Sequence, residues 1–322
     1  MVYVPGLDQV QLGAESTWGT SATATSKLGL IDDVSIDPEI NVETLKDIRG
    51  SLAPGYVDVL NSHRGGAAVS GVLTYEDTPY ILDSLLMTAT PGSGPTYIRN
   101  YTGQLTTIPT RSMYTVYKGQ SGKVQKLLGG LFTEFTVKIE TNKPWKYTSK
   151  LIGKSVADGS LESLSDRTQT PIHANTTTVY IDAVGGTIGS TAITALLFSA
   201  DMTVKNGLGL VPNIGSLTPA TYADGMAELS LKMKMAVDTD TAGYLTAILG
   251  TSVVQKQIRI KSTTGSTQIA QFDIGATFAK APKVNTDQDG VVTFDFDLTA
   301  TYNSTLGNWF KSSVTNSIAT MP

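Results

Sequence analysis

Alternation of apolar and polar residues is the strongest signal along the chain. In LFTEFTVKIE (131–140), apolar residues occupy every second position from Phe135 to Ile139, and AELSLKMKMAV (227–237) and VVTFDFDLTATY (291–302) repeat the scheme. Side chains two residues apart project from the same face of a strand, so each stretch predicts a half-buried strand. Weaker alternation predicts further strands at 28–37, 67–76, 111–118, 177–184, 195–205, 255–262 and 268–279. The fold class is therefore predicted to be mainly β.

Two short helices interrupt the predicted strands. Asp77-Thr78-Pro79 introduces YILDSLLMT, with a capping residue and then a proline where the first helical turn lacks a partner for its N–H. Asp240-Thr241 introduces AGYLTAILG, which ends at Gly250, a residue type that commonly ends helices. Each predicted helix follows directly on an alternating strand.

The same order of elements recurs in the two halves of the chain. Tyr80 and Tyr244 lie 164 residues apart, and Phe135 and Phe296 lie 161 apart, which is half of the 322 residues. A fixed offset of this kind is the signature of an internal repeat. We therefore expect a tandem duplication of a β-sandwich or barrel, each copy with one short flanking helix. The predicted domains are 1–155 and 177–322, joined by a polar linker at 156–176.

Two long segments, 41–66 and 206–224, break the alternation and are predicted to be irregular loops. Each contains an S-L-x-P step, at 51–54 and at 216–219. Long loops without regular structure are usually functional, and apolar residues on them must be covered by another surface. Such loops either dock on a neighbouring copy or fold back over their own sandwich.

Composition narrows the classes of function. Charged residues make up 16% of the chain, against roughly 25% in typical domains, and the net charge is −4. An acidic chain is unsuited to wrapping nucleic acid. The absence of cysteine excludes disulfides and thiolate sites, and two histidines exclude a His-rich metal cluster. The sequence shows no basic segment followed by an apolar one at its start, and no apolar run of spanning length, so we expect neither a secretory signal nor a membrane-spanning helix.

Candidate catalytic and ligand-binding motifs fail on spacing. Gly153-Lys154-Ser155 ends like a phosphate-binding P-loop but lacks the first glycine of the motif. The run 285–290 begins like a calcium loop but has Phe296 where a bidentate Glu is required. Asp238 and Asp240 are better interpreted as helix-capping residues than as a paired-carboxylate site. We therefore expect no enzymatic activity, no cofactor and no metal.

Three stretches resemble a known family. GAESTWGT (13–20), LGLIDDVSIDPEI with LKDIRGSLAPGY (28–40 and 45–56), and FTEFTVKIETNKPWKYTSKLIGK (132–154) are similar to the tail tube proteins of tailed bacteriophages. The resemblance implies a β-sandwich with a flanking helix, a fold shared with contractile-tail and type VI secretion tubes. It further implies a structural virion protein, the major tail tube subunit of a long non-contractile tail, which forms stacked rings around a conduit for DNA ejection.

The resemblance also implies partners and location. Members of the family usually have one tube domain per chain and form hexameric rings, so a duplicated chain implies a trimeric pseudo-hexamer. If the second half instead decorates the tube, six copies are needed. The implied partners are further copies of the chain and the tape measure, tail tip and tail terminator proteins. The implied location is the virion tail, assembled in the host cytoplasm, with DNA passing through unbound and no membrane involved.

Two sets of residues are the candidate sites. A channel wall should be polar and net negative or neutral, because it must not bind phosphates. The lumen-facing candidates are Glu134, Glu140, Asp295 and Asp297. Ring stacking is assigned to the two long loops, with Leu52, Pro54, Tyr56, Leu217 and Pro219 as the contacts.

Three other classes of protein compete with this interpretation. Another virion β-protein, such as a capsid decoration or tail fibre subunit, shares the composition. An outer-membrane β-barrel shares the alternation but should carry a signal peptide and a C-terminal aromatic strand, and this sequence shows neither. An enzyme on a β scaffold is disfavoured by the failed motifs.

Overall fold

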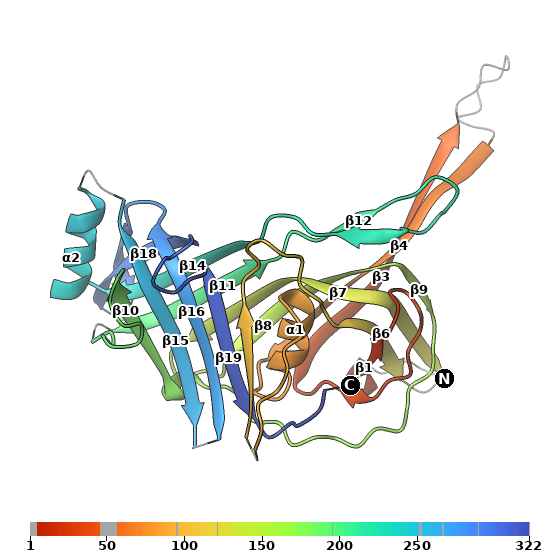
Figure 1. The fold of residues 1–322 in the computed structure, drawn as a ribbon, viewed down its shortest axis with the longest axis horizontal. Helices are drawn as coiled ribbons and strands as arrows, with labels where there is room; N and C mark the ends of the chain where they lie inside the picture. Colours follow the sequence, from red (N-terminus) through yellow and green to blue (C-terminus); the bar gives the residue numbers. More distant parts are fainter. Residues whose placement is uncertain are drawn as a thin grey trace.

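The alternating stretches form strands in the computed structural model, and the predicted mainly β class is confirmed (Figure 1). The structure describes residues 5–45, 57–94, 96–120, 122–194, 196–250, 253–265, 267–288 and 290–321. The strands are β1 (Gln9–Glu15), β2 (Ser26–Lys27), β3 (Ile31–Leu45), β4 (Val57–Val72), β5 (Tyr97–Thr102), β6 (Met113–Gln120), β7 (Lys123–Glu140), β8 (Lys146–Gly153), β9 (Ser155–Asp158), β10 (Thr177–Ala183), β11 (Leu197–Lys205), β12 (Gly209–Val211), β13 (Thr221–Ala223), β14 (Glu228–Ala236), β15 (Gln255–Thr264), β16 (Gln268–Phe278), β17 (Lys283–Gln288), β18 (Val291–Ala300) and β19 (Phe310–Asn316). The helices are α1 (Thr78–Leu85) and α2 (Thr239–Ile248), and short 3-10 turns cover Pro5–Leu7 and Ala174–Thr176.

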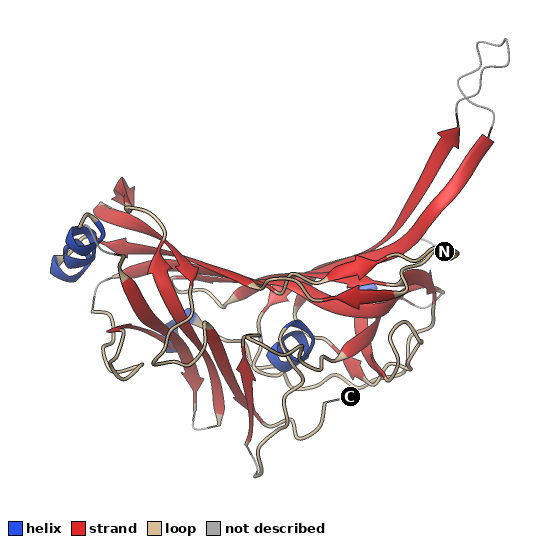
Figure 2. Cartoon of the chain, turned by 45° about the horizontal axis from the view of Figure 1, so that its top comes forward, coloured by secondary structure: helices blue, strands red, loops and turns tan. Residues whose placement is uncertain are grey.

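One continuous antiparallel sheet spans both halves of the chain. Within the described residues, eight strands pair in the order β3-β4-β8-β7-β11-β14-β18-β17. We call this the curved sheet. Figure 2 shows it nearly edge-on, with both helices and the remaining large strands on its convex side. Its concave face is therefore the face turned away from the core.

The remaining strands, apart from β12 and β13, form the second layer, and β7 connects the two layers. The second half of β7 pairs with β8 and β11 in the curved sheet, whereas its first half pairs with β6 and β9. The change occurs at Gly129, whose φ of 69° is a left-handed conformation. A Cβ at this position would lie 2.6 Å from Nε1 of Trp18, so glycine is required for space as well as for backbone geometry.

The core lies between the two layers. The apolar sides of the alternating stretches are buried, including Phe135, Leu231 and Phe296, as the period of two predicts. Trp145 on the first half is fully buried, and its ring stacks on that of Phe272 in the second half with centroids 6.1 Å apart. The two halves thus share one hydrophobic cluster.

The order of strand pairing is the same in both halves. The first half pairs as β3-β4-β8-β7-β6-β1, and the second half pairs as β11-β14-β18-β16-β15-β10. Helix α1 follows β4, and α2 follows the corresponding strand β14. The β7–β11 ladder joins the two arrangements edge to edge.

Both predicted helices are present, but their caps differ from expectation. The Asp77 carboxylate does not cap α1; it accepts hydrogen bonds from the backbone N–H of Gly29 (3.1 Å) and from Arg167 (2.6 Å). Helix α2 begins at Thr239, earlier than predicted, because Asp238 forms a capping box with Thr241. The capping interpretation of Asp238 is thereby confirmed.

Of the two segments predicted as irregular loops, 41–66 is strand throughout its described residues, whereas 206–224 is irregular apart from β12 and β13. Residues 41–45 and 57–66 continue β3 and β4 into a two-stranded ribbon that projects far from the body (Figure 1). Residues 206–224 form an arm that contains the β12–β13 hairpin. The prediction for 41–66 failed because a ribbon beyond the core needs no buried side, so its strands lack apolar alternation.

The polar segment 156–176 lies against the first half rather than standing free. Gln11 Nε2 donates to the carbonyl of Glu162 (2.8 Å), Lys27 pairs with Asp166 (2.6 Å), and Thr170 N–H donates to the Glu76 carboxylate (2.8 Å). These contacts hold the connection between the halves along the outer layer.

Candidate functional site

The concave side of the curved sheet carries the polar half of every alternating strand. We call these side chains the polar face; they come from β8, β7, β11, β14 and β18. The members are Lys146, Thr148, Lys150, Glu134, Thr136, Lys138, Glu140, Ser199, Asp201, Thr203, Lys205, Glu228, Ser230, Lys232, Lys234, Asp295, Asp297 and Thr299. All four lumen-facing candidates belong to this set.

A row of hydroxyl groups crosses the middle of the polar face. These residues lie directly opposite one another in successive strands. The row consists of Thr148, Thr136, Thr203, Ser230 and Thr299. The hydroxyls of Thr136 and Thr203 are hydrogen-bonded at 3.0 Å across the junction between the two halves.

Carboxylates on the polar face lie between lysines of neighbouring strands. Glu134 is 3.1 Å from Lys150 Nζ on one side and 4.0 Å from Lys205 Nζ on the other. Asp297 lies 2.9 Å from Lys280 Nζ. Each such pair is partly exposed and contributes little to stability. These ion pairs do, however, neutralise the charges of the lysines locally.

Glu140 shows the same arrangement most strongly. Its two carboxylate oxygens lie 2.8 Å from Lys138 Nζ and 2.6 Å from Lys143 Nζ. Hydrogen bonds from Lys138 and then Lys143 lower the pKa of Glu140 to about 2. This carboxylate therefore remains ionised throughout the physiological pH range.

Asp201 is a half-buried carboxylate in the row of side chains next to the hydroxyls. Its strand neighbours in register are Lys138 and Lys232. Burial raises the pKa of Asp201, and the charge of Lys138 opposes that rise. Glu140 adds to the rise and Lys232 also opposes it, so the two lysines offset the effect of burial only in part.

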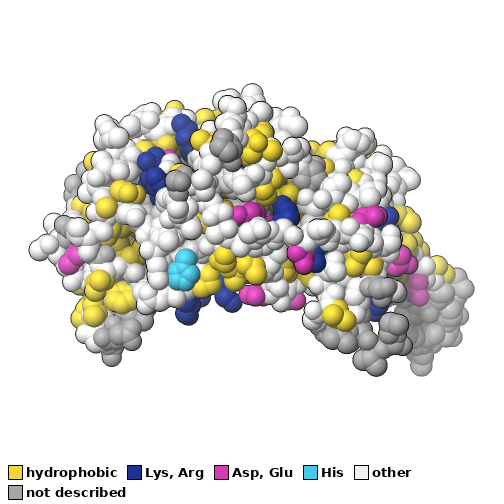
Figure 3. Space-filling model, turned by 90° about the horizontal axis from the view of Figure 1, so that it is seen from below, with side chains coloured by type: hydrophobic (Ala, Val, Ile, Leu, Met, Phe, Trp, Pro, Cys, Tyr) yellow, Lys and Arg dark blue, Asp and Glu magenta, His cyan; other side chains and the backbone are white. Residues whose placement is uncertain are grey.

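Opposite charges balance across the polar face. Its members include six lysines and six carboxylates, so its formal net charge is zero. Figure 3 views the chain from below as an arch, and both basic and acidic side chains lie along the hollow edge. The expectation of a wall that is not positively charged is therefore compatible with the arrangement of these side chains.

The stacking candidates divide into two groups. Leu52, Pro54 and Tyr56 lie outside the described residues. On the arm, Leu217 is half exposed and its carbonyl accepts a hydrogen bond of 2.8 Å from the N–H of His63 on β4. Pro219 is buried. Of the two described candidates, only Leu217 therefore presents its side chain to solvent.

A buried ion pair fixes the base of the arm to the first half. Arg111 Nη1 contacts the Asp224 carboxylate, and both side chains are almost completely buried. Nearby, Asn206 Nδ2 donates to the carbonyls of Leu85 (3.0 Å) and Phe132 (2.8 Å). Sequence reasoning missed this pair because Arg111 begins a predicted strand and Asp224 ends a predicted loop, and no local pattern relates the two residues.

The ribbon exposes apolar side chains on both of its faces. Ile40 and Val42 are more than half exposed, although each is opposite a β4 residue in the ladder. The exposed apolar set on the ribbon is Ile40, Val42, Leu45, Val57, Val59 and Leu60. Apolar side chains this far from the core are typical of a surface that another molecule covers.

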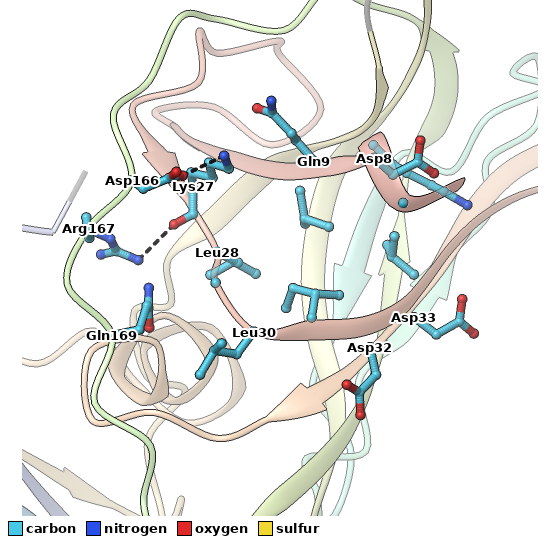
Figure 4. A pocket seen from close by; sticks show the side chains of 16 residues that line it. Asp8, Gln9, Lys27, Leu28, Leu30, Asp32, Asp33, Asp166, Arg167 and Gln169 are labelled. Atoms are coloured by element: carbon cyan, nitrogen blue, oxygen red, sulfur yellow. Dashed lines mark hydrogen bonds and ion pairs between the residues drawn. The ribbon is translucent and has the colours of Figure 1, made fainter. Parts of the chain in front are cut away.

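A cavity of about 730 Å³ opens beside the start of β3, where the two layers of the first half part (Figure 4). It is lined by residues 27–34, by the start of β1 and by segment 166–169. Lys27 and Asp166 pair at its rim, and Arg167 Nη2 donates to the Lys27 carbonyl at 3.0 Å. Leu30, in a left-handed conformation at φ 51°, is half exposed there.

Two of the side chains considered as candidates from the sequence, His173 and Lys154, contact other groups of the protein. No group of three or more His, Asp or Glu side chains within them is placed to hold a metal ion. His173 Nδ1 accepts from the N–H of Asn175 at 3.2 Å, and Lys154 lies over the ring of Trp18. Nor do the described helices include one with the length and apolar character needed to cross a membrane.

Comparison with known proteins identifies the family. No curated protein matches the chain. A family model described as Phage tail tube protein matches residues 8–300, nearly the whole chain. The chain therefore belongs to the phage tail tube proteins, a family of structural proteins of the virion tail that are not enzymes.

Proposed function

We propose that this chain is a major tail tube subunit that forms stacked rings, and that its polar face lines the conduit through which DNA is ejected. The observation that carries the proposal is the curved sheet, which places a charge-balanced polar face on its concave side and the whole core on its convex side. Copies joined side by side would close such a sheet around a channel.

The chemistry of the polar face suits the passage of DNA. A protein binds DNA by releasing counterions from phosphates with lysines or arginines. The lysines of the polar face lie beside carboxylates, so binding a phosphate would first require breaking an ion pair. The central row of hydroxyls adds hydration without charge. The wall would therefore let DNA slide without holding it.

The repeated pairing order supports two tube-fold repeats per chain. The strands of the two repeats correspond in order, with the first part of β7 matched by β16 and its second part by β17, and the β7–β11 ladder joins the repeats within the chain. On this proposal, residues 1–155 and 177–322 are the repeats, and three chains form a ring with six-fold pseudo-symmetry. A second half that decorates the outside would not supply strands to the curved sheet, whereas here it supplies β11, β14, β17 and β18.

Ring stacking is assigned to the projecting ribbon. Its exposed apolar residues have no covering surface among the described residues of the same chain, and the sequence of its tip includes Leu52, Pro54 and Tyr56. The arm presents Leu217 beside the ribbon and would add to the same contact, while buried Pro219 would shape it. The rings would therefore stack through one ribbon and one arm per chain.

The remaining assignments follow from family membership and from the sequence resemblance. The tape measure, tail tip and tail terminator proteins would contact the ends or interior of the tube. Assembly would take place in the host cytoplasm, and the tail would be a long, non-contractile one.

Negative-stain electron microscopy of the purified chain tests the proposed function. We expect striated tubes, or rings with a central hole, over a range of protein and salt concentrations. Compact monomers under all of these conditions would contradict it.

A further inference from the structure

The curved sheet ends in two strand edges, one from each half of the chain. At one end β3 pairs only with β4, and at the other β17 pairs only with β18, within the described residues. Unpaired strand edges expose N–H and C=O groups that readily pair with another chain. Each of the two edge strands, β3 and β17, is therefore available to pair with a strand of another copy.

The junction inside the chain supplies a template. There β7 and β11 are antiparallel, with Thr136 opposite Thr203 and Val137 opposite Met202. Val137 and Met202 are each 1% exposed, so this junction carries the core from one half into the other.

Strand registers identify the residues of β17 that correspond to β7. Val72 and Ala236 are the last residues of the strands that precede α1 and α2. Crossing the sheet from Val72 leads through Lys146 to Lys138. Crossing from Ala236 leads through Thr293 to Asn285. Asn285 thus corresponds to Lys138, which makes Val284 the counterpart of Val137 and Lys283 the counterpart of Thr136.

Strand registers also match β3 with β11. Asp33 of β3 is opposite Ser70, which lies two residues before the end of β4. Ser199 of β11 is opposite Lys234, which lies two residues before the end of β14. Counting along the strands makes Ile36 the counterpart of Met202 and Asp37 the counterpart of Thr203. The free edge strands β17 and β3 therefore correspond to β7 and β11, the two strands that pair at the junction inside the chain.

We propose that β17 of one copy pairs antiparallel with β3 of the next copy, with Lys283 opposite Asp37 and Val284 opposite Ile36. This inference rests on the proposed function, since it names the lateral contact of the ring. Lys283 and Asp37 are both exposed and have opposite charges, so the pairing places an ion pair on the polar side. Val284 is 58% exposed, whereas its counterpart Val137 is 1% exposed.

The cavity beside β3 fits the same partner. At the internal junction, residues 139–142 of the β7–β8 turn lie beside β10 and β11 and line part of a cavity of about 210 Å³. The same turn places buried Trp145 against the second half, with Nε1 donating to Thr177 Oγ1 at 3.0 Å. By the same register, Val292 is the counterpart of Trp145 and is 45% exposed. On this pairing, the start of β18 of the next copy, with Val292, would lie against the cavity of about 730 Å³.

Disulfide trapping tests the register directly, because the chain contains no cysteine. Opposite residues of an antiparallel pair have Cα atoms about 4.5–5.5 Å apart, within the range of a disulfide. The test variant carries Asp37→Cys and Lys283→Cys in one chain. The matched control carries Asp33→Cys and Lys283→Cys, since Asp33 is also exposed but lies about 13 Å along β3. Both variants are assembled, oxidised and run on non-reducing gels.

We expect the test variant to form covalently closed oligomers within tubes and the control to remain monomeric on the gel. If tubes form but the test pair stays reduced, or the control crosslinks equally well, the register is wrong while the tube function stands. If the parent chain forms neither tubes nor rings, the proposed function fails and the lateral contact fails with it.

Discussion

Removing the Asp224 carboxylate should release the arm from the first half of the chain. The Asp224→Ala substitution leaves Arg111 charged in a site where its side chain is about 1% exposed. Deleting one partner of a buried ion pair costs about 3–5 kcal/mol. Arg111 keeps two longer contacts, to the Leu85 carbonyl (3.3 Å) and to Gln104 Oε1 (3.2 Å), so we expect about 3 kcal/mol, the lower end of that range.

Asp224→Ala can destabilise the whole chain or release the arm alone, and two assays distinguish these outcomes. Urea denaturation of the unassembled chain measures the global free energy of unfolding. Hydrogen exchange of residues 206–224 measures local release of the arm, including the N–H of Ala220, which donates to the Val211 carbonyl at 2.9 Å. If the arm detaches first, its amides exchange faster while the global midpoint changes less than the full amount.

Two further variants serve as controls. Asp166→Ala removes an ion pair whose aspartate is 82% exposed, and should cost less than about 1 kcal/mol. The Arg111→Met/Asp224→Leu double variant removes both buried charges and should recover most of the lost stability. The reasoning is refuted if two results are found together. The free energy of unfolding of Asp224→Ala would lie within about 1 kcal/mol of the parent value, the loss typical of an exposed pair, and the amides of 206–224 would stay protected.

Four further predictions concern other parts of the molecule. Burial raises the pKa of Asp83 from 3.8 to about 6, so the folded state favours its protonated form. The free energy of unfolding should therefore fall as the pH rises from about 4 to above 6. In urea titrations Asp83→Asn should flatten this pH dependence, and an unchanged slope would count against the prediction. Trp145→Ala should cost about 3–5 kcal/mol by denaturation followed with circular dichroism, and a loss below 1 kcal/mol would mean that its stacking on the second half is unimportant. Glu134→Lys should make assembled tubes retain double-stranded DNA in a salt-dependent way that the parent does not show, and equal retention by both would contradict a neutral wall. Tyr56→Asp should leave the subunit folded and block stacking, so full-length tubes from this variant would disprove the assignment of the tip.

Strands with a regular buried side could be predicted from the sequence. In β7, β14 and β18 the apolar residues fall on every second position because one side meets the core and the other does not. The same pattern predicted that Glu134, Glu140, Asp295 and Asp297 share one polar face, since register follows from which side is buried. Helix α2 was predictable because its cap is a local feature of Asp238 and Thr241.

The features that were missed depend on contacts distant in sequence. The pattern of β8 includes buried Ser149, whose hydroxyl donates to the Val69 carbonyl at 3.0 Å, so its apolar side is interrupted. The ribbon has no core beneath it, so its apolar residues do not keep to every second position and its sequence resembles that of a loop. The Arg111–Asp224 pair joins residues that no local pattern relates. Such pairings become visible only when the strand order is known.

Cryo-electron microscopy of tubes assembled from the purified chain tests the central claim most directly. The account predicts three chains per ring, with β7, β11, β14 and β18 around a central channel and Glu134, Glu140, Asp295 and Asp297 facing it. A tube whose channel is lined by the opposite layer, or whose polar face lies on the outside, would contradict the account.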